Sequence, residues 1–195
     1  MSSRIESLQT RRSPRQQEPA LSVRPIRYLG DPVLRRRASE VPHVDDSIRQ
    51  LVDDMIESMY AADGVGLAAP QIGIGLRIVV LGMPDEEPVS IINPVIVERA
   101  GERELEGEGC LSVPGYRGSV TRSQQVTVEG LDADGRALRI TACDNLLAQA
   151  IEHEVDHVNG ILYVDRLTSI DTLTKLEGDN WGAAASNGED GDEGD

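Results

Sequence analysis

Two segments with helical periodicity bracket a series of short strand-like runs, and this order restricts the fold more than any other feature. The first helix is predicted from Asp45 to Ala62, where apolar residues recur three and four positions apart and Asp63-Gly64 ends the pattern. The second is predicted from about Asp144 to Val158, with Asp144 as its N-cap and Asn159-Gly160 as its stop. Because strands do not alternate with helices, we expect an α+β fold rather than a parallel βαβ arrangement.

The runs between the two helices carry strand signals. Leu76–Leu81 is a short apolar run, and Val89–Val97 is another with a proline inside it, which predicts an edge strand or a bulge. Val120–Gly130 and Ala137–Thr141 flank the turn sequence Asp132-Ala133-Asp134-Gly135, which predicts a hairpin. We therefore expect small antiparallel or mixed sheets packed around a central C-terminal helix, with the other helix on the N-terminal side.

The two ends of the chain differ in composition from its body. Residues 1–20 are rich in Arg, Ser, Gln and Pro, which predicts a disordered arm. Residues 178–195 are rich in Gly and acidic residues, which predicts a disordered acidic tail. The folded domain is therefore expected to span residues 21–177.

The composition excludes some classes of function. Acidic residues outnumber basic ones by 34 to 19, and a surface with a net charge of −15 tends to repel phosphate backbones. Aromatic residues make up only 3%, with no Phe, which argues against a stacking surface for single-stranded nucleic acid. We therefore expect no sequence-specific nucleic-acid partner.

The sequence shows no sign of a membrane or secretory route. It contains no apolar run long enough to span a bilayer, and its Arg-rich start lacks the apolar stretch of a signal peptide. Its two cysteines suit a reducing compartment better than a disulfide framework. A cytoplasmic protein with no membrane partner is expected.

The second predicted helix contains the sequence His153-Glu154-Val155-Asp156-His157. Residues four apart lie one turn apart on the same helix face, so both imidazoles can reach one metal ion. A glutamate next to the first histidine is suited to act as a general base on water. Leu146 and Ala150 precede His153 on the same face and would form an apolar wall beside the ion. For Asp156, orienting a ligand, capping local backbone and a solvated position are all open.

The residues alone leave the third metal ligand open. Glu177 would serve if the chain were a zinc endopeptidase, although it borders the acidic tail. Cys110 and Cys143 are the sulfur candidates; Cys143 is expected in the core, whereas Gly109 lets the backbone approach a ligand beside Cys110. A further alternative is an acidic binding module with a closed structural zinc site. The remaining histidine, His43, follows a proline in a loop and is expected to be solvated.

Three segments occur in the order that is typical of one family. They are Gly64–Gln71 with the sequence GVGLAAPQ, Glu108–Ser112 with EGCLS, and His153–His157 with HEVDH. Together they resemble bacterial peptide deformylases, and the resemblance extends from about Val23 to Leu173. The chain departs from the family at Glu152, where a glutamine is more usual, and this adds a carboxylate near the site.

The resemblance implies a metal-dependent hydrolase that removes the formyl group from the N-terminal formyl-methionine of new polypeptides. It implies Cys110, His153 and His157 as metal ligands, with Fe²⁺ as the physiological ion and Zn²⁺, Ni²⁺ or Co²⁺ able to replace it. Glu154 would be the general base, and it would then deliver the proton to the leaving amine. The Leu111 backbone N–H and the Gln71 side-chain amide would stabilise the oxyanion.

The resemblance also implies how the substrate binds. Gly66 would pair its backbone with an extended nascent peptide, and Gly109 would allow close approach beside the ligand cysteine. Val65, Leu146 and Ala150 would line the methionine pocket. Because the substrate emerges from a ribosome, a transient ribosome encounter is expected.

Overall fold

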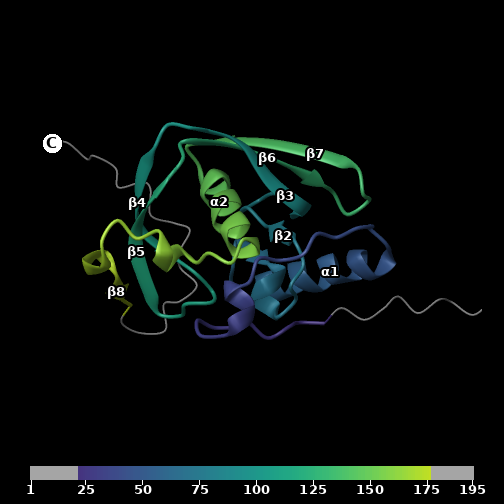
Figure 1. Ribbon diagram of the computed structural model, residues 1–195, viewed down its shortest axis with the longest axis horizontal. Coiled ribbons are helices and arrows are strands. Elements are labelled where there is room, and N and C mark those ends of the chain that lie inside the picture. Colours follow the sequence, from purple (N-terminus) through teal and green to yellow (C-terminus); the bar gives the residue numbers. More distant parts are fainter. Residues whose placement is uncertain (1–21, 177–195) are drawn as a thin grey trace, which may run out of the picture.

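The computed structural model describes residues 22–176, and within them two antiparallel sheets and two α-helices form an α+β fold, as predicted (Figure 1). The larger sheet has the order β1-β2-β3-β6-β7, with strands Gly66–Ala68, Ile78–Leu81, Val89–Ala100, Gln125–Leu131 and Ala137–Cys143. The smaller has the order β4-β5-β8, with strands Arg103–Gly109, Tyr116–Arg122 and Thr174–Lys175. The arm 1–20, the tail 178–195 and Glu177 lie outside the described residues.

Helix α1 spans Asp46–Ala61, and the prediction of this helix is confirmed at both ends. The Asp45 carboxylate accepts hydrogen bonds from the backbone N–H groups of Ser47 and Ile48, which satisfies donors that the first turn leaves unpaired. Its apolar stripe is buried against strands β1 and β2 in one of the molecule's core clusters. This helix therefore packs against the edge strand β1, which is part of the Gly64–Gln71 segment.

Helix α2 spans Leu146–Val158, and its N-cap is Asn145, one residue later than the predicted cap Asp144. The Asn145 side chain accepts a hydrogen bond from the Ala148 N–H at 2.9 Å. Asp144 instead has a left-handed backbone conformation with φ of 48°, which turns the chain out of β7.

Figure 1 shows α2 running between the small β4–β5 sheet on one side and β2, β3 and α1 on the other. Its apolar stripe packs in a core cluster with residues of β2, β3 and β6, and includes Leu147, Ile151, Val155 and Val158. The opposite face of the helix carries the two histidines. The stripe therefore fixes which face of α2 is left for chemistry.

Of the strand predictions, one needs a correction. The region around Pro94 is a bulge, as predicted, but β3 lies inside the sheet between β2 and β6 and is not an edge. The predicted strand 120–130 is divided at Ser123-Gln124, so that its first part belongs to β5 and its second to β6. The β6–β7 hairpin is confirmed, with Gln125 opposite Cys143 and Leu131 opposite Ala137.

The four remaining short elements are 3-10 turns at Pro32–Arg35, Ala69–Ile72, Tyr163–Asp165 and Ile170–Thr172. The turn Ala69–Ile72 follows β1 directly and carries Gln71 into the interior. None of the helices in residues 22–176 is both long and apolar enough to cross a membrane.

Candidate active site

Three buried side chains that suit a metal ion converge between β4 and α2. Cys110 follows the last residue of β4, and His153 and His157 lie one turn apart on α2. Their ligand atoms all lie within 4.8 Å of one another, and the Cys110 Sγ is 3.2 Å from the His157 Nε2. Cys143 is wrongly predicted as buried: it is exposed on β7, so it is not part of this cluster.

The donor set fits a divalent transition metal. Two imidazoles and a thiol are the ligand types that zinc and ferrous iron take in proteins. Glu108 Oε1 lies 2.8 Å from His153 Nδ1, which leaves the Nε2 of that ring to face the cluster. Burial lowers the pKa of His157 well below its usual value, which favours the neutral imidazole that a metal needs.

Glu108 is itself held by a buried arginine. Arg122 donates from Nε to Oε2 at 3.1 Å and from Nη2 to Oε1 at 2.6 Å, a fork-shaped pair that excludes solvent. Burial alone would raise the pKa of Glu108, but the hydrogen bonds and charges of His153 and Arg122 hold it at about 2. The carboxylate that orients His153 therefore stays ionised.

Glu154 lies beside the metal cluster and is 4% exposed. Its Oε2 is buried and makes no hydrogen bond within residues 22–176. Burial raises the pKa of this carboxyl to about 7. Gly66 packs directly against it, because a Cβ at that position would lie 2.5 Å from Oε1. A carboxylate with a free oxygen in this position is suited to exchange protons with a reacting group.

Gln71 faces the cluster with a fixed amide. Its Oε1 accepts a hydrogen bond from the Ala68 N–H at 2.7 Å, so the amide nitrogen must point the other way. That nitrogen lies 3.6 Å from the Cys110 Sγ and 3.4 Å from the Ser112 Oγ. The side chain thus presents N–H donors to the space beside the thiol.

A single pocket joins these groups. Among the sequence-predicted site residues, those that line it are Val65, Gly66, Gln71, Gly109, Cys110, Leu111, Leu146, Ala150, His153 and Glu154. The other predicted ligand, His157, is 1% exposed, and its Nε2 lies 3.2 Å from the Cys110 Sγ. The structure therefore brings together all eleven residues predicted for the site.

Comparison with known proteins decides what this site belongs to. Residues 23–172 match the family model described as polypeptide deformylase. The chain belongs to the polypeptide deformylase family. The predicted activity, hydrolysis of the formyl group from the N-terminal formyl-methionine of new polypeptides, is confirmed by this membership.

Individual members of the deformylase family are similar over most of their length. A peptide deformylase of Dehalococcoides mccartyi strain CBDB1 is 50% identical over 161 residues, which cover 82% of this chain and 95% of that protein. The crystal structure of a peptide deformylase from Legionella pneumophila has a TM-score of 0.73 and 46% identity, over 77% of this chain and 89% of that one. A peptide deformylase from Synechococcus elongatus, crystallised in complex with actinonin, has a TM-score of 0.73 and 40% identity, over 78% of this chain and 88% of that one.

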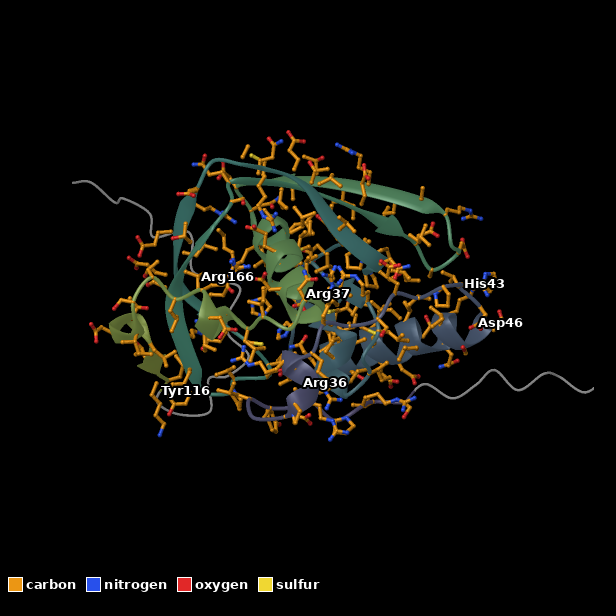
Figure 2. All side chains as sticks on the ribbon, in the orientation of Figure 1. Arg36, Arg37, His43, Asp46, Tyr116 and Arg166 are labelled. Carbon is orange, nitrogen blue, oxygen red and sulfur yellow. The ribbon has the colours of Figure 1, made fainter. Side chains whose placement is uncertain are left out.

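Sequence reasoning assigned no role to several groups at this deformylase site. A role for Glu108 could have been predicted, since it is the first residue of the EGCLS motif. Nothing in the sequence around Arg122 points to a role for that residue. A solvated Asp156 is ruled out: it is 6% exposed and accepts hydrogen bonds from Arg122 and Arg166. His43 is exposed, as predicted, and Figure 2 shows it at the end of α1 far from Arg166.

Proposed function

We propose that Cys110, His153 and His157 hold one divalent ion, with Fe²⁺ as the physiological metal and Zn²⁺, Ni²⁺ or Co²⁺ as substitutes. The observation that carries this proposal is the convergence of one thiol and two imidazoles within 4.8 Å at the floor of one pocket. An ion bound there would supply a Lewis acid that polarises the formyl carbonyl and makes water more acidic.

Glu154 acts as the general base and then as the general acid. Its carboxylate takes a proton from the attacking water and delivers it to the leaving amine as formate departs. The support is its position beside the ligand histidine and its unpaired buried oxygen. Burial raises the pKa of this carboxyl to about 7, which matches proton exchange near neutral pH.

Gln71 and Leu111 stabilise the oxyanion that forms on the formyl carbon. The amide of Gln71 is oriented by its bond to the Ala68 N–H, so no reorganisation is needed as charge develops. The Leu111 N–H lies in the same loop as the ligand cysteine, at the edge of the same pocket. Together these donors distribute the negative charge of the transition state.

The nascent peptide binds as an extended strand along Gly66, with Gly109 leaving room for its backbone. The methionine side chain enters the wall made by Val65, Leu146 and Ala150. Actinonin, which occupies the Synechococcus elongatus relative, is expected to bind in the same pocket.

Metal content and activity distinguish this proposal from the endopeptidase alternative. Cys110→Ala should lose both the metal and formate release from formyl-Met-Ala-Ser. Glu177→Ala should keep both if Glu177, which lies outside the described residues, is not a ligand. The proposal fails if Cys110→Ala retains one metal per chain, measured by atomic absorption. Any formate release by the wild type rules out a closed structural site, because such a site has no open coordination position.

We also propose that the enzyme works in the cytoplasm and meets the ribosome only transiently. The catalytic domain comprises residues 21–177, between a basic arm, 1–20, and an acidic tail, 178–195, which both lie outside the described residues. The acidic tail should be repelled by RNA phosphates. Deleting 178–195 should leave co-sedimentation with ribosomes equal or stronger, and clear weakening would refute this role.

A further inference from the structure

Arg77 is a buried cation without an acidic partner in residues 22–176. It is 5% exposed, and within the described residues its guanidinium donates only to neutral oxygens. Nη1 bonds the Asn159 Oδ1 at 2.9 Å and the Val158 carbonyl at 3.3 Å, while Nη2 bonds the Pro94 carbonyl at 2.7 Å. Burying a cation in this way costs free energy, so its location calls for a reason beyond packing.

Two of the three acceptors, the Val158 carbonyl and the Asn159 Oδ1, lie at the C-terminal end of α2. Helix ends leave their last carbonyls unpaired and carry a partial negative charge there, which a cation stabilises. Around Arg77, the last turn is closed by two more bonds: the Ala38 N–H donates to the Val158 carbonyl, and the Asn159 Nδ2 donates to the Val155 carbonyl, both at 2.9 Å. Arg77 thus ties this turn to the β3 bulge at Pro94.

The two metal-binding histidines are supported differently. His153 is oriented by the Glu108 carboxylate, which Arg122 holds in turn. His157 has no such support: its Nδ1 is buried and has no hydrogen-bond partner in the described part of the chain. The placement of this ring therefore depends on the backbone of the last turn of α2.

We propose that Arg77 is a positioning residue for metal binding, which clamps the last turn of α2 and thereby holds His157 toward Cys110. The inference rests on the proposed metal site. The backbone of Arg36 lies close to Gly160, just past the end of α2, but the side chains of Arg36 and Arg37 (labelled in Figure 2) are exposed and do not replace the buried clamp. Without Arg77 the helix can still form, but the second imidazole is less well placed before the metal binds.

The test is the Co²⁺ affinity of the metal-free protein, measured by chelator competition at a temperature where circular dichroism shows every variant folded. Arg77→Met should weaken affinity by about tenfold, the scale of an outer-shell loss. The Co²⁺ affinity of Arg77→Lys should lie between those of the wild type and Arg77→Met, because one ammonium reaches fewer of the acceptors. Val52→Ala is the matched control, since it opens a cavity on α1 in a different core cluster.

The outcomes separate this inference from the metal site itself. If Arg77→Met binds Co²⁺ no more weakly than Val52→Ala, while Cys110→Ala abolishes binding, the positioning role is wrong and the metal site stands. If Cys110→Ala binds like the wild type, the metal site is wrong. If Arg77→Met does not fold, Asn159→Ala decides, because it removes one acceptor of the clamp; an affinity within twofold of wild type would overturn the inference.

Discussion

Replacing Arg122 by methionine should strongly destabilise the metal-free domain. The guanidinium is 3% exposed and bridges two buried carboxylates, Glu108 on β4 and Asp156 on α2. Methionine fills similar space but leaves Glu108 with no cation except its histidine partner. Asp156 keeps one partner, Arg166, which is 44% exposed. The main loss is therefore at Glu108.

The magnitude follows from the pKa of Glu108, which is held at about 2 against an ordinary value of 4.5. A tenfold change in proton affinity is worth about 1.4 kcal/mol, so the folded environment favours the carboxylate by about 3 kcal/mol, shared between His153 and Arg122. Breaking a buried ion pair from one side costs about 3–5 kcal/mol. We expect the Arg122→Met substitution to lower the free energy of unfolding by about 3 kcal/mol at pH 7.

Urea denaturation of metal-free protein measures this loss without the stabilisation that a bound metal adds. A carboxyl group whose pKa is lowered in the folded state stabilises the fold at pH values above its ordinary pKa. That stabilisation is lost as the pH falls toward the pKa of the folded state. The difference between wild type and Arg122→Met should therefore shrink as pH falls from about 4.5 toward 2. Arg136→Met, at an exposed pair with Asp134, is the control and should change little. A loss at Arg122 no larger than the control would refute the reasoning.

Three other changes have defined outcomes. Gly66→Ala would place a methyl 2.5 Å from the Glu154 Oε1, so formate release should fall by about 100-fold or more with little change in melting temperature; normal activity would contradict the close packing. Glu152→Gln should lower the free energy of unfolding, measured by urea denaturation, by about 1–2 kcal/mol. The two carboxylate oxygens accept three hydrogen bonds, from the N–H and the Oγ of Ser123 and from Arg99, and the single amide oxygen of glutamine cannot accept all three; an unchanged midpoint would refute this. Asp54→Asn should destabilise the fold at pH 7, and this loss should shrink as pH falls below 3.8. Burial alone would raise the pKa of Asp54, but its hydrogen bonds lower it, so the stabilisation by the carboxylate is lost on acidification; a pH-independent loss would disprove this.

The parts of the fold that were predictable depend on local signals. Helix α1 follows from its apolar spacing and from Asp45, whose cap needs only the next three residues. The placement of His153 and His157 on one face of α2 follows from their four-residue spacing. The start of α2 was misplaced because Asp144 and Asn145 are both good N-caps. The choice between them depends on the chain leaving β7, where the Asp144 N–H bonds the Gln124 carbonyl.

The supporting network of the site was not predictable, because its members are distant in sequence. Arg122 joins Glu108 and Asp156 only when β5 pairs with β4 and its end lies beside α2. Arg77 has the same property, since two of its three acceptors are main-chain carbonyls that any sequence would offer. The departure at Glu152 was visible in the sequence, but its three hydrogen bonds to Ser123 and Arg99 depend on tertiary packing.

The most direct test of the proposed chemistry is formate release from formyl-Met-Ala-Ser by anaerobically prepared wild type and Glu154→Gln, with the metal content of each measured. Glutamine keeps the shape of the side chain but cannot take up a proton. We predict one metal per chain in both proteins and a loss of activity of at least about 100-fold in the variant. Wild-type activity in a fully metal-loaded Glu154→Gln protein would contradict the account.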